Sequence, residues 1–184
     1  MRVRGLAGRV RNLVWLAVLI LTATAGTKAE GQQTAHDVDV PSLLVEEVRQ
    51  VTRQYGDVSA AAGAGYEQFL GCVSGPQEGA MGVHFVNAAL VGDGEIDVNH
   101  PEALIYESKN GTLTLLGVEY IVVADAWHSH HPLPPVLEGQ VFQYNTSPNR
   151  YGLPPFYELH VWAWRANPHG AFVDWNTRVS CEGQ

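Results

Sequence analysis

Two histidines lie in the middle of apolar segments that are typical of β-strands. His84 is part of MGVHFVN, and His160 is part of YELHVWAWR. Two neutral imidazoles with one or two carboxylates, held on rigid strands, form the ligand set of a catalytic zinc site or of a non-haem iron site with one position open for water or substrate. Whether this chemistry applies here depends on the acids that lie near the two histidines.

Glu119 is the acid whose surroundings the sequence defines best. Asn110-Gly111 between two β-rich segments predicts a type I′ hairpin turn, and an uninterrupted ladder from this turn pairs Glu102 with Glu119. The same register places Glu119 in an apolar row with Leu113, Leu115, Ile121 and Val123. Two facing carboxylates in such surroundings are destabilising unless they share a proton or a cation.

These patterns predict a centre for a divalent transition metal, with Zn, Fe or Cu as the candidates. Its predicted ligands are His84, Glu119 and His160. Glu102 or Glu158 is then expected to act as an acid or base, or to hold a ligand in place. The alternative for Glu119 is a buried acid that is hydrogen-bonded to backbone amides or to a tyrosine, such as Tyr120 or Tyr157.

Tryptophans surround the second histidine. Side chains alternate between the two faces of a strand, so Trp162 and Trp164 fall on the face of Glu158 and His160, and Trp127 lies in a neighbouring loop. We expect an aromatic-lined cleft in which Trp127, Trp162 and Trp164 contact a ligand. Packing of the indoles in the core is the alternative.

The first 29 residues have the pattern of a secretory signal peptide. Four arginines precede the apolar segment Leu13 to Leu21, and small residues follow up to Ala29. An uncleaved signal anchor is the alternative, but this apolar segment is shorter than the roughly 20 residues that a spanning helix needs. We therefore expect cleavage after residue 29 and a single domain over residues 30–184 that is not inserted in a membrane.

The chain after this segment is strongly acidic. It carries six basic and 19 acidic residues, which gives a formal charge of −13. Such a charge repels nucleic acid phosphates and anionic lipid surfaces. The expected partners are therefore a metal ion or a small molecule, and the sequence leaves the oligomeric state open.

Two cysteines, Cys72 and Cys181, remain in the expected mature chain. An even number of cysteines in an exported chain predicts a disulfide bond, which here would tie the C-terminus to the end of a helical region. A catalytic thiol at Cys72 is the alternative, but no nearby segment suggests a base to pair with it. The disulfide and the leader together predict a secreted or periplasmic protein.

The pattern of apolar residues predicts helices first and strands afterwards. An amphipathic helix is expected to begin at Pro41, and an alanine-rich one is expected over Val58 to Leu70. The expected strands are Met81–Ala88, Glu102–Ser108, Thr112–Ala124, Gly139–Tyr144 and Tyr157–Arg165. This order predicts an α+β fold in which two N-terminal helices pack on a curved antiparallel sheet of about five strands, approaching a half-open barrel.

Several segments resemble a family of uncharacterised exported bacterial proteins. They are GAMGVHFVN, GVEY and LHVWAWRANPHGAFVDWN. The resemblance extends from about Val48 to Cys181. It implies a shared fold and a bacterial, extracytoplasmic setting, but no activity and no functional residues.

Three functions are compatible with these features. The first is a metal-dependent hydrolase or oxidase that uses the His/Glu centre. The second is a binding module without enzymatic activity, which holds a small apolar or sugar-like ligand among the tryptophans. The third is a structural domain of the cell envelope.

Overall fold

The computed structural model describes residues 42–182 of the chain. The expected signal peptide, residues 1–29, lies outside the described residues. Within residues 42–182, no helix has both the length and the apolar character needed to cross a lipid bilayer.

The N-terminal helical region is shorter than expected. Helix α1 (Leu43–Thr52) buries one apolar face and continues into a 3₁₀ turn, η1 (Arg53–Gly56). Helix α2 (Val58–Gly63) then begins at Asp57, whose carboxylate accepts the backbone N–H of Ser59 at 2.9 Å, as an N-cap residue does. The predicted continuation of this helix to Leu70 is wrong, because the helix ends at Gly63.

The segment after α2 forms a strand that the sequence pattern did not indicate. Strand β1 (Glu67–Ser74) is an edge strand, and most of its positions are exposed or only half-buried. It is also irregular: Leu70 has a positive φ of 59°, and the register with its neighbour shifts twice. Exposure and bulges remove the alternation by which a strand is recognised.

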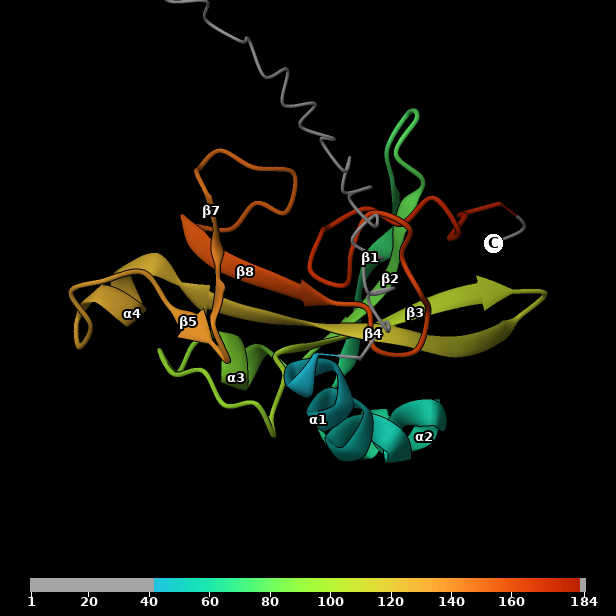
Figure 1. Cartoon of the computed structure of the whole chain (residues 1–184), viewed down its shortest axis with the longest axis horizontal. Helices are drawn as coiled ribbons and strands as arrows, with labels where there is room; N and C mark the ends of the chain where they lie inside the picture. Colours follow the sequence, from blue (N-terminus) through green and yellow to red (C-terminus); the bar gives the residue numbers. More distant parts are fainter. Residues whose placement is uncertain (1–41, 183–184) are drawn as a thin grey trace, which may run out of the picture. The chain divides into compact units, whose positions relative to one another are not determined.

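Six strands form one antiparallel, curled sheet (Figure 1), where about five were expected. Its order is β1, β2 (Ala80–Val86), β3 (Ala103–Lys109), β4 (Thr112–Val123), β8 (Phe156–Val161) and β7 (Gln143–Asn145). The predicted strand at 139–144 is divided between β7 and a separate small hairpin, β5 (Val136–Leu137) with β6 (Gln140–Val141). Two short helices, α3 (Ala88–Val91) and α4 (Ala124–His128), follow β2 and β4.

The two faces of the sheet have different roles. Helices α1 and α2 cover one face and form the main core (Figure 1), which includes Leu44, Val48, Phe85, Leu104, Tyr120 and Leu159. The opposite face is covered by two chain segments, in which Tyr151 and Leu153 pack on Phe156, and Val179 packs with Trp162. The α+β class and the curled antiparallel sheet therefore agree with the prediction, whereas the placement of the helices and the number of strands differ from it.

The register of the β3–β4 hairpin agrees with the prediction only near its turn. Tyr106 pairs with Leu115 as expected, but a bulge then shifts the ladder by one residue, so that Ile105 pairs with Gly117. Beyond the bulge Ala103, not Glu102, lies opposite Glu119. The predicted Glu102–Glu119 pair is wrong, because one extra residue in a ladder changes every later pairing.

The bulge also changes which side chains share a face. Leu115 belongs to the main core, whereas Glu119 lies on the other face together with Ile121. The predicted apolar row through Leu113, Leu115 and Glu119 is therefore interrupted. Glu119 lies instead on the face that is covered by the C-terminal segments.

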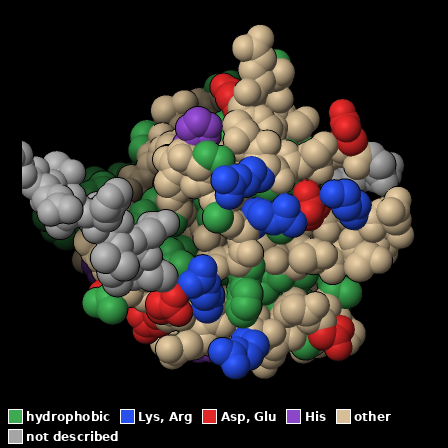
Figure 2. All heavy atoms as spheres, turned by 45° about the vertical axis from the view of Figure 1, so that its right-hand side comes forward, with side chains coloured by type: hydrophobic (Ala, Val, Ile, Leu, Met, Phe, Trp, Pro, Cys, Tyr) green, Lys and Arg blue, Asp and Glu red, His purple; other side chains and the backbone are tan. Residues whose placement is uncertain are grey.

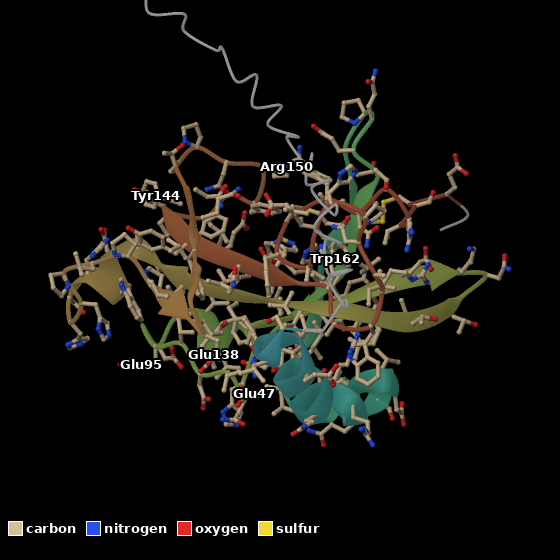
Figure 3. The ribbon with its side chains drawn as sticks, in the orientation of Figure 1. Glu47, Glu95, Glu138, Tyr144, Arg150 and Trp162 are labelled. Atoms are coloured by element: carbon tan, nitrogen blue, oxygen red, sulfur yellow. A yellow bond between two sulfur atoms is a disulfide. The ribbon has the colours of Figure 1, made fainter. Side chains whose placement is uncertain are left out.

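Cys72 and Cys181 form the predicted disulfide bond (Figure 3), across a separation of 109 residues. Because Cys72 lies in β1, the bond ties the C-terminal segment to the edge of the sheet and not to the helical region. The same segment also pairs with β2 through reciprocal backbone hydrogen bonds between Ala80 and Asn176, both 3.2 Å long.

The surface carries basic side chains despite the acidic composition. On the face shown in Figure 2, Lys and Arg side chains lie next to acidic ones. One such contact in the structure is between Arg165 and Glu107, whose side-chain atoms are 2.8 Å apart.

Candidate metal centre

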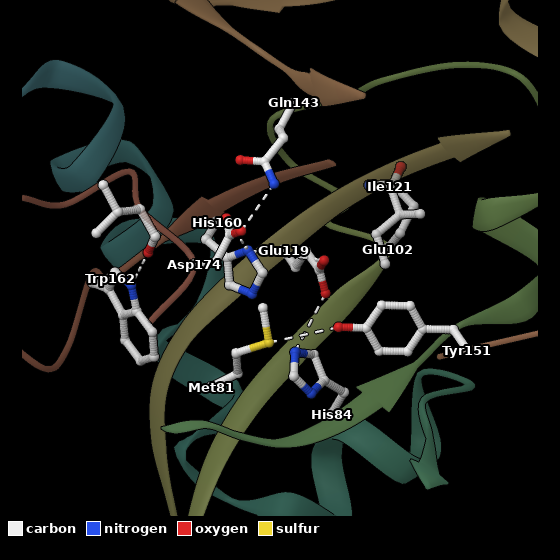
Figure 4. Close-up of polar contacts among 11 residues, drawn as sticks. Met81, His84, Glu102, Glu119, Ile121, Gln143, Tyr151, His160, Trp162 and Asp174 are labelled. Atoms are coloured by element: carbon white, nitrogen blue, oxygen red, sulfur yellow. Dashed lines mark hydrogen bonds and ion pairs between the residues drawn. The ribbon is translucent and has the colours of Figure 1, made fainter. Parts of the chain in front are cut away.

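The sheet brings the three predicted ligands together on the face opposite the helices (Figure 4). His84 is on β2, Glu119 on β4, and His160 on β8 directly opposite Glu119. One potential ligand atom from each residue lies within 4.8 Å of the others. Strand β3 separates β2 from β4; on it Ile105 lies opposite His84 and Ala103 lies opposite Glu119.

The distances within this group are longer than ordinary hydrogen bonds. His84 Nε2 is 3.4 Å from Glu119 Oε2, and His160 Nδ1 is 3.9 Å from Glu119 Oε1. Nitrogen and oxygen ligands lie about 2.0–2.2 Å from a zinc ion, so two ligands of one ion are about 3.0–3.6 Å apart. Small side-chain adjustments would therefore bring all three residues into contact with one ion.

His160 is buried without a hydrogen-bond partner. Its exposed fraction is 1%, and neither ring nitrogen has a partner among residues 42–182. A histidine with a purely structural role is expected to donate one ring N–H to a protein acceptor, because buried polar groups are nearly always paired. A buried imidazole with no ordinary hydrogen bond in the described residues, and with carboxylate oxygens 3.5 and 3.9 Å from Nδ1, is compatible with a metal ligand.

Two further acids lie next to His160. The His160 Nδ1 atom is 3.5 Å from Asp174 Oδ1, and Glu158 completes a second group of three potential ligands with these two residues. Glu158 is buried, and its Oε2 atom has no partner within the described part of the chain. Gln143 on β7 donates a hydrogen bond of 3.0 Å to the other oxygen of Asp174.

Asp174 is the member of this cluster that sequence reasoning missed. It lies in an irregular segment between Val173 and Trp175, where no strand or helix periodicity indicates the direction of a side chain. The pairing of Asn176 with Ala80 and the hydrogen bond from Trp162 N to Ala171 O fix this segment over the sheet. The only sequence signal was its place in the block LHVWAWRANPHGAFVDWN.

Burial and mutual contacts shift the pKa values of these groups in different directions. Burial and the neighbouring His160 lower the pKa of His84 to about 3, so its imidazole is neutral and can coordinate a metal. Burial, together with the charge of Glu158 and a hydrogen bond to it, raises the pKa of Glu119 well above its usual range. Burial also acts to raise the pKa of Asp174, but the contacts with His160 and Gln143 outweigh it and lower that pKa.

Glu102 does not belong to either group of converging ligands. It lies just before β3, and its Oε2 atom accepts the backbone N–H of Ile121 at 2.9 Å. Burial raises the pKa of Glu102 to about 8. The alternative interpretation of Glu119, a buried carboxyl that is hydrogen-bonded to the main chain, therefore describes Glu102.

The tyrosines considered as partners of Glu119 bond elsewhere. The Tyr120 hydroxyl donates to Val98 O at 2.8 Å. The Tyr157 hydroxyl contacts His128 Nε2 at 2.9 Å.

The three tryptophans do not line a common cleft. Trp162 is buried, its Nε1 donates to Val173 O, and its ring stacks on His160 with 6.3 Å between the ring centres. Strand β8 ends at Val161, and Trp164 contacts Thr52 of α1 on the helix side of the sheet. Trp127 stacks on His131 in the loop after α4. The predicted alternation therefore holds as far as Trp162 and fails at Trp164.

A pocket of about 380 Å³ is lined in part by His84 and Glu119. Its walls are mostly apolar and include Phe69, Leu70, Val86, Ile121, Leu153 and Phe156. His84 and Glu119 are among its few ionisable lining residues, and neither Lys nor Arg lines it. Trp127, Trp162 and Trp164 do not contribute to its wall.

No family model, no curated protein and no solved structure matches this chain.

Proposed function

We propose that the domain binds a divalent transition metal through His84, Glu119 and His160, and that it uses this ion in hydrolysis or oxidation of a small molecule held in the adjoining pocket. Such an ion would act as a Lewis acid or would activate a bound water molecule. The two histidines and one carboxylate leave positions open for water and substrate, as catalytic sites require.

One observation carries this proposal: the fully buried His160, whose two ring nitrogens have no hydrogen-bond partner in the described residues. Leaving such groups unpaired costs about 1–3 kcal/mol each. A bound cation would remove this cost for one of the two ring nitrogens, and His84 and Glu119 lie where they could complete its coordination.

The pocket favours a small, mostly apolar substrate. It has the size of a typical small-molecule site, and its apolar walls end at His84 and Glu119. In this proposal Glu158, which neighbours Glu119, acts as an acid or base or holds Glu119 in position. Glu102 is the weaker candidate, because its carboxyl already accepts the backbone N–H of Ile121.

The same pocket supports a second candidate function, a binding module for a small apolar ligand without catalysis. In that case His84 and Glu119 would only orient the ligand. The contacts would come from the aliphatic and aromatic residues that line the pocket, because the three predicted tryptophans lie outside it.

An exported, bacterial setting also belongs to the proposal. The Cys72–Cys181 disulfide is compatible with an oxidising compartment. The leader-like segment and the resemblance to exported bacterial proteins support the same setting.

Metal content tests the proposed function directly. We expect protein purified from metal-supplemented cells, after removal of loosely bound ions, to contain at least one equivalent of Zn, Fe or Cu by elemental analysis. The double variant His84→Gln/His160→Ala should lose the ion in the group that contains Glu119. The expected drop is one equivalent or more, because at most one protein ligand of that group remains.

The control is His130→Ala, because His130 is an exposed histidine outside both groups of ligands. This variant should keep the metal content of the wild type. Wild-type protein without metal, or a double variant with the metal content of the wild type, would contradict the metal centre and leave the binding module as the better account of the pocket.

A further inference from the structure

We infer that the cluster holds two cations, and that His160 bridges them. The second ion would bind Glu158, Asp174 and His160, the second group of three buried or half-buried ligands. This inference rests on the proposed function, because His160 serves both ions.

The geometry at His160 separates the two sites. Its Nδ1 atom is closer to Asp174 Oδ1, at 3.5 Å, than to Glu119 Oε1, at 3.9 Å. In Figure 4 one ring nitrogen of His160 faces Asp174, and the other is directed to the side where His84 lies. We therefore assign Nδ1 to the second ion and Nε2, on the His84 side of the ring, to the first ion. Glu119 would reach the first ion through Oε2, which is 3.4 Å from His84 Nε2, and not through Oε1, which is 3.9 Å from His160 Nδ1.

Unpaired buried atoms support two ions better than one. One ion in the His84 group would engage only one nitrogen of His160, and the other nitrogen and Glu158 Oε2 would still have no partner. A second ion between Glu158, Asp174 and His160 would satisfy both of these atoms. Glu158 and His160 are 3% and 1% exposed, so both side chains are almost fully buried.

Each site also has its own access to solvent. His84 and Glu119 line the apolar pocket described above. Asp174 and Gln143 line a separate, more polar hollow of about 520 Å³, together with His169 and Trp175. The second ion could therefore enter, and keep its water ligands, on the side away from the apolar pocket.

Zinc stoichiometry of the apoprotein tests the inference. Metal-free wild type titrated with Zn²⁺, and followed by calorimetry with parallel equilibrium dialysis, should bind two ions per chain. Asp174→Asn should bind one ion and His84→Gln should bind one ion, because each variant removes a ligand of one site only. Glu158→Gln serves as a second variant of the Asp174 site, and Asp125→Asn is the control for loss of an exposed acid.

A copper readout tests the bridge independently of stoichiometry. Two Cu²⁺ ions joined by an imidazolate couple their spins, so wild type with two ions should give a much weaker paramagnetic resonance signal per copper than Asp174→Asn with one. Circular dichroism spectra equal to that of the wild type would show that each variant is folded.

The outcomes separate the two proposals. If wild type binds one zinc ion that Asp174→Asn retains and His84→Gln loses, the metal centre stands and the second site is refuted. One ion that both variants lose would indicate a single shared ion, which also refutes the second site. Wild type that binds no zinc would overturn both.

Discussion

Among the individual residues, the two acids that the sequence paired have different chemistry. Glu119 lies beside two imidazoles and a second carboxyl, without any of the predicted tyrosine partners. Glu102 accepts a backbone N–H from Ile121 and lies outside the ligand groups. A buried acid is thus not in itself a sign of a functional site. What distinguishes the proposed metal centre is that several buried groups converge there and that His160 has no hydrogen-bond partner among residues 42–182.

Glu102 should make the stability of the protein depend on pH. Its pKa is about 8 in the folded state, against 4.5 for the unperturbed group, so between these values the folded chain holds a proton that the unfolded chain has released. The free energy of unfolding therefore falls as pH rises through this window. Relative to wild type, Glu102→Gln should gain stability as the pH rises from 4.5 to 8, on the order of 5 kcal/mol at the upper end.

Denaturant unfolding of both proteins at several pH values measures this difference. The amide oxygen of Gln can still accept the N–H of Ile121, so the variant keeps the contact and loses only the titration. A constant difference in unfolding free energy between pH 4 and pH 9 would show that Glu102 does not titrate in this window.

At the level of secondary structure, the bulge in β4 determines where Glu119 points. The ladder follows the predicted register from the turn to Tyr106, and the extra residue then moves Glu119 to the face of His160. Gly117 lies at the bulge, and the backbone of β8 passes directly over it. A Cβ atom at this position would meet Val161 O and would lie 3.2 Å from Trp162 Cα.

Replacement of Gly117 by alanine should therefore separate β4 from β8. We expect Gly117→Ala to lower the free energy of unfolding by about 1–3 kcal/mol. It should also weaken zinc binding at least tenfold, because Glu119 and His160 lie on the two strands that move apart. The control is Gly71→Ala on the edge strand β1, where a Cβ would meet no atom within 4 Å. If Gly117→Ala and Gly71→Ala have the same zinc affinity and the same stability, this role of the bulge is contradicted.

The sequence predicted the regular parts of the fold and missed the irregular ones. Periodicity located β2, β3, β4 and the start of β8, and the three predicted ligands lie on three of these strands. The bulge near Gly117 has no signature in a single sequence, so the pairing of Glu102 with Glu119 was wrong. Asp174 and Trp164 lie outside strands, where alternation gives no direction to a side chain.

For residues 42–182 as a whole, the site depends on segments that are far apart in the sequence. Strands β2, β4 and β8 supply four of the five residues of the proposed ligand cluster, and the C-terminal segment supplies Asp174. Two attachments hold this segment: the pairing of Asn176 with Ala80 and the disulfide between Cys72 and Cys181. In the proposed centre the disulfide would therefore also help to hold Asp174 in place.

Removal of the disulfide should affect stability and the two proposed sites unequally. The bond closes a loop of 109 residues, for which the loss of unfolded-state entropy corresponds to about 2–5 kcal/mol. We expect Cys72→Ala/Cys181→Ala to lose stability in this range in denaturant unfolding. Zinc affinity should fall more at the Asp174 site than at the His84 site. Equal losses at both sites, with the fold intact, would contradict the tethering role of the disulfide for Asp174.

The most direct test of the metal centre is the anomalous diffraction of crystals grown from zinc-loaded protein, measured on both sides of the zinc absorption edge. The expected result is a peak about 2.0–2.2 Å from His84 Nε2, a Glu119 oxygen and a His160 nitrogen. Crystals with no anomalous peak there, in which both imidazoles are hydrogen-bonded to water or to the protein, would contradict the proposal.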